Sequence, residues 1–200
     1  KEYGRSDYGK GEKVMIEFVS ANPTGPMHMG NARGGAIGDC LAAAMDACGY
    51  DVTKEFYIND AGNQIVNLGL SLEARYRQLL GQEGCEIPEN GYHGQDIIDT
   101  AQRIVDAVGD SYLQLPEAER QEKMIATALD EKIAAIKSGL AAFGVEYDVW
   151  FSETTLHESG AVQEVVDLLT EKGMTYEKDG AVWYNNIKVQ TEMLTRQGKT

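Results

Sequence analysis

VMIEFVSANPTGPMHMGNARGGAIGDCLAAAMDACGYDVTKEFYI, at residues 14–58, is the stretch that indicates the fold. Its first six residues are nearly all apolar, as is typical of a parallel strand covered on both faces. A loop follows, and apolar side chains then recur at helical spacing until Gly49, where we expect the helix to end. These side chains are Ile37, Leu41, Met45 and Cys48. The β-branched and aromatic run over residues 52–58 predicts a second strand, so the whole stretch predicts a right-handed βαβ unit.

The rest of the chain predicts further helices around this unit. We expect a mobile lead-in over residues 1–13, the first βαβ half of an α/β core over 14–80, and a helical insertion with further core elements over 81–200. Asp179-Gly180 is a two-residue turn signal, and it predicts a hairpin over residues 175–184. The other predicted elements are helices near residues 61–80, 96–108, 116–144 and 162–173, and a third strand near 147–151.

The charge balance limits the classes of partner. The 200 residues contain 18 Lys and Arg against 32 Asp and Glu, a formal net charge of −14. Because phosphate contacts need Lys and Arg, so acidic a chain is not expected to bind nucleic acid over a broad surface. No apolar run approaches the roughly 18 residues that a membrane span needs, so no membrane partner is expected.

The cysteines and the two chain ends carry further expectations. The three cysteines form no CxxC pair, which argues against a structural zinc site or a disulfide framework. Cys40 and Cys48 lie eight residues apart on the expected helix, and we expect both to be small buried hydrophobes. The chain begins at Lys1 and stops at Thr200, and we interpret it as a piece of a longer protein.

The loop over residues 17–31, EFVSANPTGPMHMGN, is the candidate functional segment. It would join the carboxyl end of a strand to the N-terminus of a helix, which is where α/β sheets bind ligands and where anions are stabilised. It contains neither a P-loop nor a GxGxxG pattern. His28 could instead donate to phosphate oxygens, and Gly30 would let the backbone approach a nucleotide closely.

The candidate residues of this loop also have structural alternatives. Glu17 could be an ordinary carboxylate at the end of a strand. Ser20 and Asn22 could shape the turn before Pro23, since both side chains bond readily to nearby backbone. Asn31 could serve only as a helix cap. The loop therefore predicts a binding site without separating its ligands from its scaffold.

A second polar segment, YINDAGNQI at residues 57–65, follows the second strand. Its Asn59, Asp60 and Gln64 are candidates for an active-site face. They could equally cap the next helix, with Asp60 as the N-cap. Both interpretations remain open from the residues alone.

The two segments together resemble a known family. The HMGN tetrad at residues 28–31 looks like the HIGH motif of class I aminoacyl-tRNA synthetases. The longer pattern ExxSANPTGPxHxGxARGxxxGD, residues 17–39, resembles arginyl-tRNA synthetases specifically, as does YINDAGNQI at 57–65. GYHGQDI at 91–97 and DGAVWY at 179–184 extend the resemblance over essentially the whole chain.

The resemblance implies a fold and an arginine-binding role. The fold would be a Rossmann-like (HUP-type) parallel-sheet nucleotide-binding core with a helical and hairpin insertion, incomplete at its C-terminus. Ser20 and Asn22 would hold the head group of the amino acid. Glu17 would pair with the arginine guanidinium group, a role that suits a carboxylate facing a planar cation.

The resemblance also implies an ATP-binding role. Pro23, His28, Gly30 and Asn31 would contact ATP, with His28 and Asn31 in catalytic roles. Asn31 is a departure, because the family usually has a second histidine at this position. An asparagine can donate to a phosphate or ribose oxygen, but it cannot carry positive charge.

The implied activity is that of an arginine–tRNA ligase acting in the cytoplasm in translation. ATP with Mg²⁺ would activate L-arginine to arginyl-adenylate, and the arginyl group would pass to tRNA(Arg), with no metal site on the protein itself. The family's KMSKS-type loop does not occur in these residues, and tRNA would bind mainly through domains that are not in them. We therefore expect that these 200 residues alone do not charge tRNA. We also expect the protein to be a monomer.

Two alternatives remain. One is another adenylate-forming ligase of the HIGH superfamily, although such enzymes lack the SANPTGP and YINDAGNQ strings. The other is a degenerate, non-catalytic synthetase-like module, which Asn31 keeps open. Arginine-dependent activation would separate the first from the expected enzyme, and the effect of Asn31→His would test the second.

Overall fold

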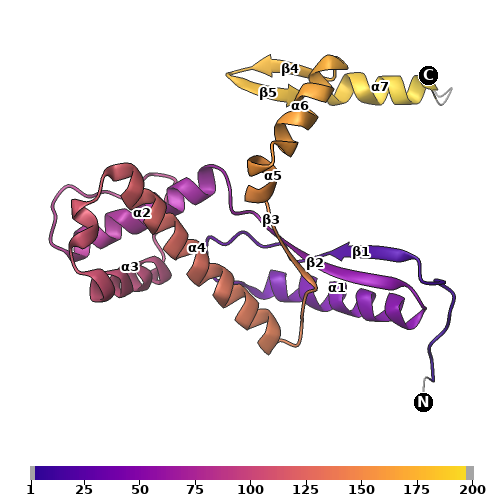
Figure 1. The fold of residues 1–200 in the computed structure, drawn as a ribbon, viewed down its shortest axis with the longest axis horizontal. Coiled ribbons are helices and arrows are strands. Elements are labelled where there is room, and N and C mark those ends of the chain that lie inside the picture. Colours follow the sequence, from indigo (N-terminus) through magenta and orange to yellow (C-terminus); the bar gives the residue numbers. More distant parts are fainter. Residues whose placement is uncertain (1–2, 197–200) are drawn as a thin grey trace. The chain divides into compact units, whose positions relative to one another are not determined.

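The computed structural model describes residues 3–196, and it has the expected α/β fold (Figure 1). Three parallel strands form one sheet in the order β1-β2-β3: β1 (Lys13–Glu17), β2 (Asp51–Ile58) and β3 (Val149–Ser152). The helix α1 (Met29–Ala47) connects β1 to β2, which confirms the predicted βαβ unit. The first two residues of the expected lead-in and the last four residues of the chain lie outside the described residues.

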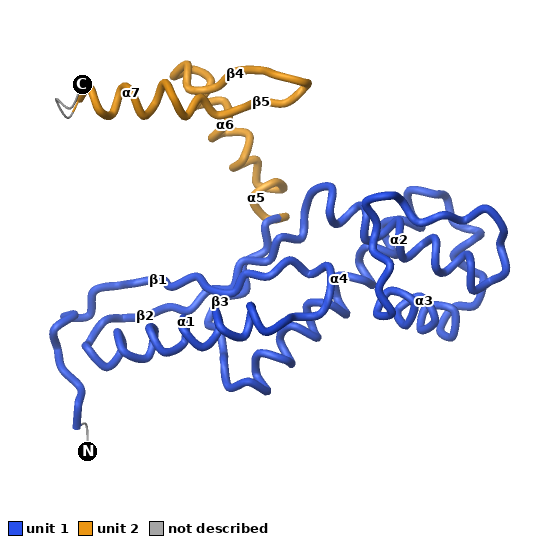
Figure 2. The backbone as a smooth tube through the Cα atoms, turned by 180° about the vertical axis from the view of Figure 1, so that it is seen from behind, with its two compact units in different colours: residues 1–153 blue, residues 154–200 orange. Residues whose placement is uncertain are grey.

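The chain divides into two compact units (Figure 2). Residues 1–153 form the first unit, which contains the sheet and the helices α1–α4. Residues 154–200 form the second unit. The candidate loops at residues 17–31 and 57–65 both belong to the first unit, so the candidate site lies within one compact unit.

The helix α1 packs on the sheet through small residues and not through its apolar stripe. Gly35, Gly38 and Ala42 are its buried residues, whereas Ile37 is 64% exposed and Leu41 is 49% exposed. A Cβ atom at Gly38 would lie 2.2 Å from Cγ of Phe18, so the helix axis can approach this closely only with glycine there.

Two sequence-based expectations about burial are wrong. Cys40 and Cys48 are exposed, because the face of α1 that meets the sheet carries glycine and alanine. The strand β1 is not covered on both faces: Val14 and Ile16 are half-buried, whereas Met15 on the opposite face is 57% exposed. Alternation along a strand turns successive side chains to opposite faces, and only one face of β1 is covered in the described structure.

The helices α2, α3 and α4 pack together around a hydrophobic core of their own (Figure 1). Their bounds are Asn63–Leu79 for α2, Gln95–Val108 for α3 and Glu117–Ala142 for α4, with a 3₁₀ turn at Ser111–Gln114. These bounds confirm the predicted helices to within a few residues. Apolar side chains from all three helices are fully or almost fully buried in this core: Leu68, Leu72, Tyr76, Ile97, Ala101 and Met124. No helix among residues 3–196 has the length and apolar character to cross a membrane.

The second unit contains short elements. They are α5 (Thr154–Glu158), α6 (Ala161–Glu171), β4 (Thr175–Lys178), β5 (Ala181–Tyr184) and α7 (Asn186–Arg196). The strands β4 and β5 pair antiparallel around Asp179 and Gly180, whose φ angles are 54° and 75°. Positive φ at both central residues is characteristic of a type I′ turn, and the predicted hairpin is confirmed.

Candidate active site at the carboxyl edge of the sheet

The carboxyl ends of the three parallel strands bring acidic side chains to one edge of the sheet. Glu17 is the last residue of β1, and Glu153 directly follows β3. Between them, the Tyr57 hydroxyl on β2 donates a hydrogen bond to Oε2 of Glu153 at 3.0 Å. Glu17 was expected at this edge from the sequence, whereas Glu153 was missed. A carboxylate one residue after a parallel strand was the available signal.

The electrostatics of this edge favour positive charge. The pKa of Tyr57 is raised above its usual range, first by burial and then by the hydrogen bond and the negative charge of Glu153. The charges of Asp60 and Glu17 raise it further. Each of these three carboxylates disfavours a negative charge on the tyrosine, and each would stabilise a cation in the same place.

The loop leaves β1 through a strained turn. Val19 and Ser20 have φ angles of 67° and 40°, in the left-handed region that a β-branched residue such as valine rarely adopts. The amide of Ser20 donates to the carbonyl of Phe18 at 3.0 Å, and Oγ of Ser20 accepts from the amide of Tyr57 at 3.1 Å. Ser20 therefore holds the loop against β2, which supports the alternative that its side chain shapes the turn before Pro23.

Asn22 and Gln64 join the two candidate segments. Nδ2 of Asn22 donates to Oε1 of Gln64 at 2.8 Å, across 42 residues of sequence. Both side chains are exposed, whereas Pro23 is buried and Asn59 is half-buried. The structure thus brings the loop after β1 and the start of α2 together, as a shared active-site face requires.

Asp60 does not cap α2, so that alternative is wrong. The N-cap position is Gly62, with φ 84° and no side-chain cap, because the chain enters the helix through a conformation that favours glycine. Oδ2 of Asp60 instead accepts from the hydroxyl of Ser152 at the end of β3, at 2.5 Å. Asp60 therefore links the ends of β2 and β3 at the acidic edge.

His28 and Asn31 form a reciprocal cap at the N-terminus of α1. Nδ1 of His28 accepts from the amide of Gly30 at 3.1 Å, and Oδ1 of Asn31 accepts from the amide of His28 at 3.0 Å. Because Nδ1 accepts, the proton of the neutral imidazole is on Nε2, which leaves an N–H donor at the helix N-terminus. The side chain of Asn31 likewise keeps its amide nitrogen as a donor.

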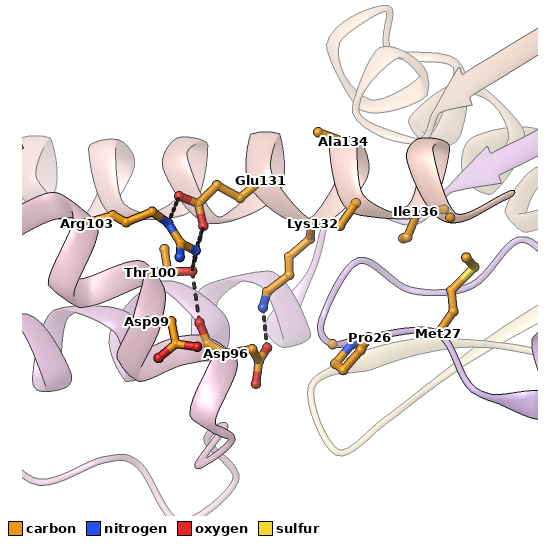
Figure 3. Close-up of a pocket in the computed structure, with 13 residues that line it drawn as sticks. Pro26, Met27, Asp96, Asp99, Thr100, Arg103, Glu131, Lys132, Ala134 and Ile136 are labelled. Atoms are coloured by element: carbon orange, nitrogen blue, oxygen red, sulfur yellow. Dashed lines mark hydrogen bonds and ion pairs between the residues drawn. The ribbon is translucent and has the colours of Figure 1, made fainter. Parts of the chain in front are cut away.

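A pocket of about 670 Å³ lies beside the same loop, between Gly25–Met27 and the helices α3 and α4 (Figure 3). Its polar groups are paired: Lys132 forms an ion pair with Asp96, and Arg103 forms a bidentate pair with Glu131 at 2.6 and 2.9 Å. None of the ten residues proposed from the sequence lines it.

Among residues 3–196, no group of three or more His, Cys, Asp or Glu side chains is arranged to hold a metal ion.

Residues 1–192 match the family described as tRNA synthetases class I (R), catalytic domain. The chain belongs to this family.

Curated relatives of this class I synthetase domain are arginine–tRNA ligases. The ligase of Caldanaerobacter subterraneus is 60% identical over 184 residues, which are 92% of this chain and 33% of that protein. The ligase of Moorella thermoacetica is 59% identical over 198 residues, which are 98% of this chain and 35% of that protein. The chain therefore spans about a third of the length of these relatives.

Solved structures support the same class I synthetase fold. A putative arginyl-tRNA synthetase from Campylobacter jejuni superposes with a TM-score of 0.75 at 32% identity, covering 92% of this chain and 39% of that one. The arginyl-tRNA synthetase of Thermus thermophilus superposes with a TM-score of 0.53 at 20% identity, covering 85% of this chain and 29% of that one. The second likeness concerns the fold alone.

Proposed function

We propose that this chain forms part of the arginine-activating site of an arginine–tRNA ligase. The observation that carries the proposal is the family match over residues 1–192, which includes the loop between β1 and α1. In the proposed reaction, the carboxylate of L-arginine attacks the α-phosphorus of ATP, and pyrophosphate leaves. A hydroxyl of the 3′-terminal ribose of tRNA(Arg) then attacks the arginyl carbonyl, and AMP leaves as the ester forms.

The acidic edge supports arginine as the substrate. Glu17 ends β1 near the hydroxyl of Tyr57, whose pKa it helps to raise. A carboxylate in that position can take the two N–H groups of a guanidinium in parallel, which an ammonium or a neutral amide cannot match. Ser20 and Asn22, on the following turn, are proposed to hold the amino-acid head group, with Gln64 orienting Asn22.

The N-terminus of α1 supports the ATP side of the reaction. In the proposal, Nε2–H of His28 donates to the phosphates, beside Pro23, and Gly30 lets the backbone approach the nucleotide closely. The histidine donor is preorganised by the cap, so it needs little rearrangement as negative charge grows on the α-phosphate. Mg²⁺ bound to ATP as part of the substrate would offset charge on the phosphates.

Asn31 is proposed to act through both of its side-chain groups. Its oxygen holds the backbone of His28, and its Nδ2 donates to ATP. A histidine at this position could carry positive charge, whereas asparagine supplies only a neutral donor. We therefore expect a slower activation step and no change of substrate.

The proposed function also implies how the chain is organised and where the protein acts. We propose that residues 14–80 form the first half of the catalytic core and residues 81–200 an insertion with further core elements. tRNA(Arg) would bind mainly outside these 200 residues, whose net charge of −14 disfavours a long phosphate-contacting surface. The complete protein is proposed to act as a monomer in the cytoplasm.

The test is exchange of pyrophosphate into ATP by the complete protein that carries this sequence, with and without tRNA. We expect exchange with arginine and none with lysine or glutamine. Exchange driven by another acid would point to a different adenylate-forming ligase. If a folded, ATP-binding protein shows no exchange with either Asn31 or the Asn31→His variant, the non-catalytic module is the better interpretation. We also expect no tRNA charging by residues 1–200 alone.

A further inference from the structure

The turn at Val19–Ser20 needs an external restraint. Both residues have positive φ angles, and neither is glycine. The turn lies directly between Glu17, at the end of β1, and the loop residue Asn22, so its shape decides where the loop points. A backbone held in a sparsely populated conformation persists only where neighbouring groups fix it.

One such group comes from a distant part of the sequence. The hydroxyl of Tyr147 donates to the carbonyl of Phe18 at 3.1 Å, across 129 residues. The same carbonyl accepts a hydrogen bond from the amide of Ser20 at 3.0 Å, so these two hydrogen bonds, which fix the turn, meet at this oxygen. Tyr147 lies between α4 and β3, outside both candidate segments.

The ring of Tyr147 is itself held firmly. Its centroid lies 4.6 Å from that of Phe18, 5.4 Å from that of Phe56 and 5.2 Å from that of Trp150. Burial, with a smaller contribution from the charge of Asp39, raises the pKa of Tyr147 well above its usual range. The hydroxyl therefore stays protonated and remains a donor throughout the neutral range.

We propose that Tyr147 is a positioning residue that holds the Val19–Ser20 turn, and with it the arginine-binding loop, in its working conformation. It touches neither substrate in this scheme; it acts through the carbonyl of Phe18. The inference rests on the proposed function for its kinetic consequences but not for its structural ones. Removing the hydroxyl should let the turn relax towards ordinary φ angles and displace Ser20 and Asn22.

The test uses Tyr147→Phe in the complete protein, because phenylalanine keeps the ring packing and removes only the hydroxyl. We expect the KM for arginine in pyrophosphate exchange to rise about three- to tenfold, as loss of one hydrogen bond implies, with kcat changed less. Tyr76→Phe is the matched control. Its hydroxyl also donates to a backbone carbonyl, that of Gly109 at 2.6 Å, but in the helical core, so it should leave the KM for arginine unchanged.

A second variant separates positioning from general loss of packing. Val19→Gly removes the strain, because glycine adopts positive φ readily. In the Val19→Gly background, Tyr147→Phe should therefore have a smaller effect on KM than in the native background. An unchanged KM in Tyr147→Phe, or effects of the two changes that simply multiply, would overturn the proposal.

Hydrogen exchange keeps the inference testable if the proposed function fails. The amide of Tyr57 donates to Oγ of Ser20, so it reports on the turn without any substrate. We expect this amide to exchange faster in Tyr147→Phe and to keep its native rate in Tyr76→Phe. If the Tyr57 amide is equally protected from hydrogen exchange in Tyr147→Phe and in the native protein, the inference is refuted. If the native protein shows no arginine-dependent exchange of pyrophosphate into ATP, only the proposed function is refuted.

Discussion

Replacing Gly38 with alanine should destabilise the protein although it improves the helix. The new Cβ would lie 2.2 Å from Cγ, 2.4 Å from Cδ2 and 2.6 Å from Cβ of Phe18, whereas ordinary contact begins at 3.4 Å. Phe18 cannot easily retreat, because its carbonyl is tied by Tyr147 and its ring packs on the Tyr147 ring. Overpacking of this kind costs about 3 kcal/mol at the upper end of the usual range. Alanine regains about 1 kcal/mol of helix propensity, so the net loss is about 2 kcal/mol.

Gly34 gives the matched control for this prediction. It lies on the same helix, and a Cβ there would meet nothing within 4 Å. Gly34→Ala should therefore stabilise the protein by up to about 1 kcal/mol. Urea unfolding of the complete protein, followed by circular dichroism, gives both free energies of unfolding. If Gly38→Ala were as stable as Gly34→Ala, the close packing of α1 on the sheet through Gly38 would be refuted.

Three further changes test other parts of the structure. Asn31→Ala should lower the free energy of unfolding in urea by about 1 kcal/mol, because half of the α1 cap is lost; no loss would contradict the cap. Arg120→Met should lower the free energy of unfolding by about 1.5–3 kcal/mol, because Glu73 loses its charge-assisted bond to Arg120 at 2.6 Å and keeps its ion pair with Arg77 at 3.1 Å, and adding Glu73→Leu should recover part of that loss. The hydrogen bond from Arg103 lowers the pKa of Glu131, so the native protein should melt higher than Glu131→Gln above about pH 4.5 and lose that advantage as the pH falls through the lowered pKa. Melting curves between neutral and acid pH measure this difference, and a gap that does not change with pH would contradict the ion pair.

The order of the elements could be predicted from the sequence because it depends on short-range patterns. The apolar run of β1, the periodic residues of α4 and the turn at Asp179-Gly180 each have a local signature, and each element is present. Burial was predicted less well. The apolar stripe of α1, with Ile37 and Leu41, faces away from the sheet, because a helix can also pack through its smallest residues when these allow a closer approach.

In the candidate site, local placement could likewise be predicted from the sequence, whereas long-range contacts could not. The placement of His28 and Asn31 at a helix N-terminus follows from their position after a strand and a loop, and both were expected there. The role of Asp60 was open, because an aspartate directly before the helix expected at residues 61–80 suits a cap, and only the topology places it against Ser152 at the end of β3. Long-range hydrogen bonds of this kind have no signature in a single sequence.

The strained turn shows why such contacts cannot be read locally. Taken alone, Val19 favours an extended backbone, and its sequence neighbours give no sign of a positive φ angle. The conformation is stable because two groups far along the chain, the Tyr57 amide and the Tyr147 hydroxyl, bond to the residues on either side of it. The energy that overrides the local preference of valine therefore comes from β2 and from the segment after α4. A change at Tyr147 should consequently alter the binding loop while every residue of the loop remains in place.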